Sequence, residues 1–171
     1  GGAASRRGVL STCNYIARKY GIRSAMPTHK ALQLCPELVI LPGRMDAYKA
    51  ASQHIQQIFQ RYTDIIEPLS LDEAYLDVTH NKKGNPSASL IAEEIRERIL
   101  KEVGLTASAG ISINKFIAKV ASDYNKPNGQ KTVTPEEVIE FLELLDVRKF
   151  YGVGKVTAEK CIKKEFSLVK I

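Results

Sequence analysis

Two adjacent carboxylates, Asp72 and Glu73, separate two short apolar runs at 65–69 and 74–78. The second run alternates apolar and polar residues, which is typical of a half-buried strand. A turn between two paired strands breaks this alternation, so that neighbouring carboxylates can face the same side. Mg²⁺ prefers clustered carboxylate oxygens and takes water and substrate phosphates at its other positions. A solvated acidic turn is the commoner reading of a bare Asp-Glu pair, so the pair alone leaves both readings open.

The pattern along the rest of the chain predicts an α+β fold. Apolar spacing and capping residues predict helices over 15–20, 28–34, 46–62, 86–103, 114–123 and 134–145. Alternation and composition predict strands over 9–12, 65–69, 74–78, 105–113 and 130–133. Two helices backing an antiparallel-rich sheet form an α+β sandwich.

Several residues are expected to fix the helix ends. Thr28, Asn85 and Asn114 are expected as N-caps, and 134–137 has the pattern of a capping box with proline at the first helical position. Gly104 should end the long helix before it, and Gly21 the short one near the N-terminus. One face of the 105–113 strand carries only Thr106, Ser108, Gly110 and Ser112. Such a face either leaves room for another molecule or packs tightly, and the pattern leaves both open.

Composition fits a globular protein with a polyanionic partner. The 171 residues are 44% hydrophobic, and no apolar run approaches the roughly 18 residues of a membrane span. The net charge of +6 suits a polyanion, and the first part of the chain is rich in cations, namely Arg6, Arg7, Arg18, Lys19, Arg23 and Lys30. Cys13, Cys35 and Cys161 show no Cys-x-x-Cys spacing, which favours reduced thiols in the cytoplasm.

The run 70–77, Ser-Leu-Asp-Glu-Ala-Tyr-Leu-Asp, resembles the palm motif of the Y-family translesion DNA polymerases, most closely the bacterial polymerase IV type. Further segments resemble the family in the family's own order: 7–15, 17–21 and 23–27 in the fingers, 107–111, 115–119 and 125–129 in the palm, and 152–155 in the thumb. The resemblance implies a small fingers subdomain over 1–46, a palm sheet backed by helices over 47–134, and a truncated helix-hairpin-helix thumb over 135–171.

The resemblance also implies an activity and its residues. Such polymerases add deoxynucleotides to a primer 3′ end by phosphoryl transfer with two metal ions. Asp72 would be a ligand of Mg²⁺, Glu73 would lie beside the metal at the primer hydroxyl, and Asp77 would be structural. Hydroxyls and cations for the incoming triphosphate are expected from Ser11, Thr12, Tyr15, Arg18 and Lys126. DNA phosphates are expected at the hairpin, on Gly152, Gly154 and Lys155.

Partners follow from the same resemblance: primer–template DNA, deoxynucleoside triphosphates, and a sliding clamp contacted through regions outside this chain, with no membrane. Arg6, Arg7 and Arg23 could line the path of the template, although surface charge is the better reading for each. A different palm-type enzyme, such as a nucleotide cyclase, remains an alternative, and so does a non-catalytic fragment that binds nucleic acid.

The sequence departs from the family pattern in three places. Tyr151 stands where family members usually carry proline before the first glycine of the hairpin. Nothing in the chain matches the family's first strand, which carries a further metal-binding Asp followed by an aromatic residue. The chain stops at Ile171, inside the expected thumb. We therefore expect a piece of a longer protein that folds at least in part, with marginal stability, but does not polymerise by itself.

Overall fold

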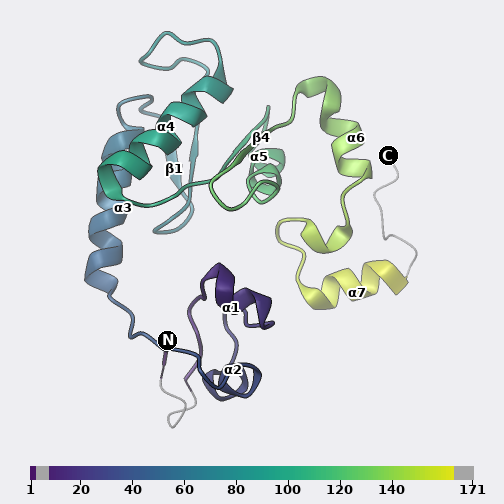
Figure 1. The fold of residues 1–171 in the computed structure, drawn as a ribbon. Coiled ribbons are helices and arrows are strands. Elements are labelled where there is room, and N and C mark those ends of the chain that lie inside the picture. Colours follow the sequence, from purple (N-terminus) through teal and green to yellow (C-terminus); the bar gives the residue numbers. More distant parts are fainter. Residues whose placement is uncertain (3–7, 164–171) are drawn as a thin grey trace. The chain divides into compact units, whose positions relative to one another are not determined.

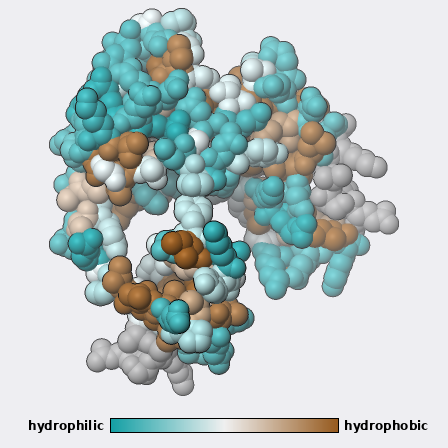
Figure 2. Space-filling model, in the orientation of Figure 1, coloured by the Kyte–Doolittle hydropathy of each residue, from teal (hydrophilic) through white to brown (hydrophobic). Residues whose placement is uncertain are grey.

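A computed structural model describes residues 1–2 and 8–163 (Figure 1). The chain forms two compact units, Gly1–Tyr48 and Lys49–Ile171. Apolar side chains remain exposed on the first unit, and Figure 2 shows brown groups over the region of its two short helices. Within the described residues, no helix is both long and apolar enough to cross a membrane.

In the first unit, α1 (Tyr15–Lys19) and α2 (Thr28–Leu34) pack around a small core made by Leu10, Ala17, Ile22 and Ala31. The Asn14 side chain accepts the N–H of Ala17 at 2.8 Å and so caps α1. The helix ends before Gly21, as the sequence predicts, and this glycine takes a φ of 79° that other residues rarely adopt.

Two details of this unit differ from the prediction. The strand expected over 9–12 is a single antiparallel bridge between Val9 and Pro27, because the partner segment is extended only briefly: Ala25 has a left-handed φ of 61°, and α2 begins at Thr28. Thr28 is the first residue of α2 and does not cap it. The buried Thr28 hydroxyl instead donates to the carbonyl oxygen of Gly2 at 2.7 Å, which satisfies a polar group that the core would otherwise leave unpaired.

In the second unit, β1 (Ile66–Pro68) and β2 (Ala74–Leu76) form an antiparallel hairpin in which Glu67 lies opposite Tyr75. Two long helices, α3 (Met45–Phe59) and α4 (Ala88–Val103), back this hairpin (Figure 1). The cluster between them consists of Ile58, Tyr62, Ile91, Ile95 and Ile99. The predicted long helices and the predicted hairpin are therefore confirmed.

A second sheet pairs β3 (Ala109–Ile111) with β4 (Gln130–Thr132) in parallel. The chain crosses between these strands through α5 (Lys115–Ala121), and a helical crossover brings the second strand back in the same direction as the first. The α+β class is confirmed, but the single antiparallel-rich sheet is wrong, because the described strands form two two-stranded sheets and one of these is parallel.

The small-residue face of the predicted 105–113 strand is explained by close packing. A Cβ atom on Gly110 would lie 1.8 Å from the carbonyl oxygen of Ala118 and 2.5 Å from the nitrogen of Ser122. Helix α5 therefore lies directly on β3, and at this position no room remains for another molecule. Regular pairing is also shorter than predicted, since it is confined to Ala109–Ile111.

The caps of the second unit follow the prediction except at the start of α4. Ser87, not Asn85, caps α4, since its hydroxyl accepts the N–H of Leu90 at 3.3 Å, while Asn85 Oδ1 accepts the N–H of Ser87 at 2.9 Å. Gly104 ends α4 in the left-handed conformation, and Asn114 caps α5, both as predicted.

The remaining elements follow the second sheet. The helix predicted over 134–145 begins as a 3-10 turn, η2 (Pro135–Glu137), and continues as α6 (Val138–Glu143). The turn η3 (Val147–Lys149) and the helix α7 (Lys155–Lys163) come next. A second core joins this part of the chain to α5 and is made by Ile117, Val120, Ala121, Val133, Phe141 and Leu145.

Candidate functional site

The acidic pair lies at the turn between β1 and β2, as the sequence predicts. The N–H groups of Leu69 and Ser70 donate to the carbonyl oxygen of Glu73 at 2.9 and 3.2 Å and close the turn. The Ser70 hydroxyl donates to Oδ1 of Asp72 at 2.7 Å. Within the described residues, the exposed Asp72 carboxylate has no other side-chain partner, so its Oδ2 can accept a ligand.

Glu73 is held in a different way, by an ion pair with Lys119 of α5. The Lys119 side chain is only 15% exposed and that of Glu73 is 38% exposed. Burial alone would lower the pKa of Lys119, but the hydrogen bond and the charge of Glu73 outweigh it, and the pKa is raised. Lys119 is therefore charged at neutral pH and restricts the rotation of the Glu73 carboxylate.

A second lysine of α5, Lys115, pairs with Glu67 of β1. Aromatic rings lie near both ammonium groups: the Tyr75 ring centroid is 5.8 Å from Lys115 Nζ, and the Tyr151 centroid is 5.8 Å from Lys119 Nζ. Sequence reasoning gave the two lysines no role. Their spacing of four residues on one helical face was the available signal.

Asp72 and Glu73 fit part of a divalent-cation site. Their carboxylate oxygens are the ligand type that Mg²⁺ prefers. Among residues 1–2 and 8–163, however, no group of three His, Cys, Asp or Glu side chains lies close enough together to hold a metal ion. The other ligands would have to be water, substrate phosphates or groups beyond the described residues.

Asp77, for which the sequence predicts a structural role, directly follows β2. It is exposed and accepts the N–H of Thr79 at 2.9 Å. Hydrogen bonds from Thr79 lower the pKa of this carboxyl.

The four triphosphate candidates of the first unit lie at and just before α1. The guanidinium carbon of Arg18 is 5.8 Å from the centroid of the Tyr15 ring, so these two side chains are in contact. Ser11 and Thr12 are exposed. Their approach to the acidic turn of the other unit stays a prediction.

Arg23 has a local role in the same unit. Its Nη1 donates to the carbonyl oxygens of Arg18 and Ile22, both at 2.7 Å, which supports the end of α1. Arg6 and Arg7 lie outside the described residues.

Lys126 lies in the loop between α5 and β4 and pairs with Asp123 at 2.6 Å. The two side chains are 42% and 63% exposed, and an exposed pair of this kind contributes little free energy. Among the described contacts, no ion pair joins Lys126 to Asp72 or Glu73.

The predicted DNA-binding hairpin precedes α7. Gly152 has a φ of 85°, and the carbonyl oxygen of Gly154 accepts the N–H of Ala158 at 2.9 Å, so Gly154 directly precedes the first turn of α7. The first N–H groups of an α-helix have no partner within the helix and can bind a phosphate. Lys155 is exposed at the same end.

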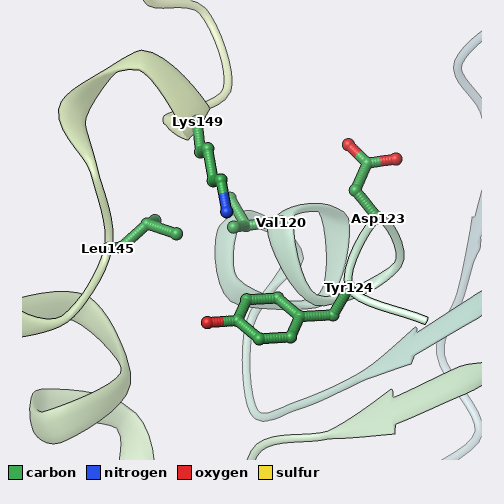
Figure 3. A pocket seen from close by; sticks show the side chains of 5 residues that line it. All are labelled: Val120, Asp123, Tyr124, Leu145 and Lys149. Atoms are coloured by element: carbon green, nitrogen blue, oxygen red, sulfur yellow. The ribbon is translucent and has the colours of Figure 1, made fainter. Parts of the chain in front are cut away.

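A pocket lies between the end of α5 and η3 (Figure 3), and its lining residues are Val120, Asp123, Tyr124, Leu145 and Lys149. The Lys149 ammonium is 5.7 Å from the centroid of the Tyr124 ring. None of the site residues predicted from the sequence lines this pocket. Of its lining residues, Asp123 forms an ion pair with the predicted site residue Lys126.

Comparison with known proteins identifies the family. Residues 1–123 match the impB/mucB/samB family, and residues 135–164 match the HHH motif of the IMS family. A DNA polymerase IV of Cronobacter sakazakii is 66% identical over 160 residues, which are 94% of this chain and 46% of the relative.

Solved structures agree with this match. The crystal structure of DinB from Sulfolobus solfataricus has a TM-score of 0.87 at 36% identity and covers 94% of this chain and 48% of that chain. The insertion ternary complex of Dbh DNA polymerase has a TM-score of 0.82 at 36% identity and covers 91% of this chain and 45% of that chain.

This chain therefore belongs to the impB/mucB/samB family, and its fold agrees with that of the solved structures. Within that family it matches the Y-family DNA polymerase IV proteins, so the resemblance drawn from the sequence is confirmed. The chain spans about half the length of the curated relatives it matches.

Proposed function

We propose that the protein containing this chain is a template-directed DNA polymerase of the low-fidelity translesion type, which acts when damaged DNA is replicated. The observation that carries the proposal is the exposed Asp72–Glu73 turn in a chain 66% identical to a DNA polymerase IV. Its substrates would be primer–template DNA and deoxynucleoside triphosphates. A similar structure described as an insertion ternary complex of a DNA polymerase supports this choice.

The proposed subdomains are a fingers-like segment over 1–46, a palm-like core over 47–134 and the start of a thumb over 135–171. The division of the chain after Tyr48 supports the first boundary, and the HHH match over 135–164 supports the second.

Asp72 and Glu73 would hold the divalent cations, which we propose to be two Mg²⁺ ions. Such ions, when bound, stabilise the attacking and leaving oxygens of an in-line displacement. Ser70 orients Asp72 by binding Oδ1, which leaves Oδ2 for a cation. Lys119 fixes Glu73 on the side proposed to receive the primer hydroxyl.

The triphosphate would be bound by residues that donate to phosphate oxygens: Ser11, Thr12, Tyr15, Arg18 and Lys126. Arg18 can donate two parallel N–H groups to one phosphate, and the Tyr15 ring beside its guanidinium limits its motion. Lys126 would act as a point charge after leaving Asp123, at little cost because that pair is exposed.

The hairpin residues Gly152, Gly154 and Lys155 would bind the DNA backbone at the start of α7 without reading sequence. We also propose a cytoplasmic location, which the free thiols of Cys13, Cys35 and Cys161 support. A sliding clamp would be contacted through regions outside this chain, as the family resemblance suggests.

Primer extension tests the proposal. The sample is this chain completed with the flanking regions of the Cronobacter sakazakii relative, referred to below as the completed protein. It is incubated with primed template, Mg²⁺ and each triphosphate in turn. Extension directed by the template base supports the proposal. A cyclic product from one triphosphate without DNA would instead show a cyclase, and DNA binding without turnover would show a binding module.

A further inference from the structure

Arg96, on α4, links three separate segments through its guanidinium group. Its Nε donates to the carbonyl oxygen of Ala107 at 3.0 Å and its Nη1 to Oε1 of Gln130 at 3.1 Å. Its Nη2 donates to the carbonyl oxygen of Asn128 and, at 3.2 Å, to Oδ1 of the same residue. Every one of these acceptors is neutral.

The neighbouring Arg98 shows how different this arrangement is. Arg98 lies on the same helix and pairs with Glu94 and Glu102, both also on α4. Among the described residues no carboxylate pairs with Arg96, so its positive charge is not neutralised locally. Both of these ion pairs lie within α4, whereas Arg96 connects that helix to the segment that carries Lys126.

The 125–130 loop is a tight reversal that needs such support. Asn128 has a φ of 51°, a left-handed conformation that costs free energy in any residue other than glycine. A Cβ atom on Gly129 would lie 2.2 Å from the carbonyl oxygen of Asn125, so the chain folds closely on itself. Arg96 binds both polar oxygens of the left-handed residue and can hold this conformation in place.

A second bond fixes the same end of the loop to α4. The Gln130 side chain accepts from Arg96 and donates through Nε2 to the carbonyl oxygen of Ser89 at 3.0 Å. Among the described residues, Lys126 itself pairs only with the exposed Asp123. The loop backbone is thus held from α4, while the Lys126 side chain stays free to exchange partners.

We propose that Arg96 is a positioning residue that fixes the 125–130 loop so that Lys126 meets the phosphates of the incoming nucleoside triphosphate. This rests on the function proposed above for Lys126. Arg96 acts through the loop and does not contact the nucleotide. Its unpaired charge also raises the positive potential at the loop, which favours a polyanionic ligand.

The test compares Arg96→Lys with Arg98→Lys in the completed protein. Each change keeps the charge and removes the guanidinium fork. Backbone hydrogen exchange over 125–131 should quicken in Arg96→Lys and stay at the wild-type rate in Arg98→Lys. The nucleotide kcat/KM should fall roughly 5- to 10-fold in Arg96→Lys alone, as expected when charge-assisted bonds that order a binding group are lost. DNA affinity should not change.

A double-mutant cycle with Lys126→Ala separates positioning from general destabilisation. If Arg96 acts through Lys126, adding Arg96→Lys to Lys126→Ala should lower kcat/KM little further. Should Arg96→Lys fail to fold, Gln130→Ala removes one of its acceptors and should produce a smaller effect in the same direction.

The proposal would be overturned if backbone hydrogen exchange over 125–131 were the same in Arg96→Lys as in the wild type. It would also be overturned if the fold losses of kcat/KM in the two single variants multiplied in the double variant. Normal nucleotide kinetics in Lys126→Ala would overturn both the role of Lys126 and the link to Arg96. Primer extension by that variant would show that polymerase function itself still stands, so the two failures can be told apart.

Discussion

The two small sheets of the second unit each carry part of the proposed site, and they are held together differently. The β1–β2 hairpin is local: its strands are joined by the acidic turn itself and rest on an apolar cluster. The β3–β4 pair needs a helical crossover, and polar side chains of α4 tie it in place, above all Arg96. The turn that carries Asp72, a proposed metal ligand, therefore depends on nearby chain, while the loop of Lys126 depends on distant contacts.

Within the acidic turn the same contrast appears between neighbouring residues. Asp72 is oriented by Ser70, two residues away. Glu73 is oriented by Lys119, 46 residues away on the crossover helix of the other sheet. Helix α5 thus serves both sheets, since it packs on β3 through Gly110 and also holds Glu73.

The largest expected effect comes from removing everything outside this chain. The hairpin supplies two carboxylates, whereas two bound metal ions need a further bridging ligand. The 171-residue chain alone should therefore give no detectable primer extension, whereas the completed protein at the same concentration should extend the primer clearly. Comparable extension by both would show that a residue of this chain supplies the missing ligand.

Gly110→Ala should break the parallel pair. The new Cβ would overlap the backbone of α5, and overpacking against backbone costs about 1–3 kcal/mol or more. Urea unfolding of the completed protein measures the loss. Gly43→Ala is the matched control, because nothing lies within 4 Å of that position, and it should change stability by less than about 0.5 kcal/mol. Equal stability of the two variants would refute the close packing.

Lys119→Met and Lys115→Met compare two ion pairs between one helix and one hairpin. The Lys119 pair is largely shielded, while the Lys115 and Glu67 side chains are 61% and 58% exposed. We expect Lys119→Met to lower the rate of single-nucleotide incorporation about 10-fold, since a shielded partner is lost, and Lys115→Met to lower it by less than about 2-fold. Equal rates in both variants would contradict the positioning of Glu73 by Lys119.

Tyr62→Phe tests the apolar support of the hairpin. Burial, with a further contribution from Glu94, raises the pKa of Tyr62 from 10.0 to about 12. The stability that this shift contributes is complete below pH 10 and is lost as the pH rises through about 12. Among the described residues the buried Tyr62 hydroxyl has no hydrogen-bond partner, so the change should cost nothing at neutral pH.

Urea unfolding between neutral pH and pH 12 measures this effect. Stability should fall less steeply above pH 10 in Tyr62→Phe than in the wild type, and the exposed Tyr48→Phe should follow the wild type. A clear loss of stability in Tyr62→Phe at neutral pH would show that the hydroxyl does support the hairpin.

The local features could be predicted from the sequence, and the long-range ones could not. The runs beside Asp72 and Glu73 define the hairpin because a short turn forces neighbouring strands to pair. The alternation around Gly110 predicts a strand but does not reveal which strand pairs with it. That pairing depends on the helical crossover through α5, which brings β4 beside β3. Asn85 and Ser87 are both good capping residues, so the first residue of α4 is not fixed by composition. The partners of Lys119 and Arg96 are distant in the chain, and charge alone does not reveal them.

The central claim is that the exposed carboxylate of Asp72 is a metal ligand required for the reaction. Asp72→Asn keeps the shape and the bond to Ser70 but loses the anionic oxygen, and Asp77→Asn is the control at an exposed aspartate that accepts the N–H of Thr79. Primer extension by the completed protein under Mg²⁺, with melting temperatures recorded for both variants, is the measurement. The account predicts that Asp72→Asn melts like the wild type and extends almost no primer, while Asp77→Asn extends normally. Near-normal extension by Asp72→Asn would contradict it.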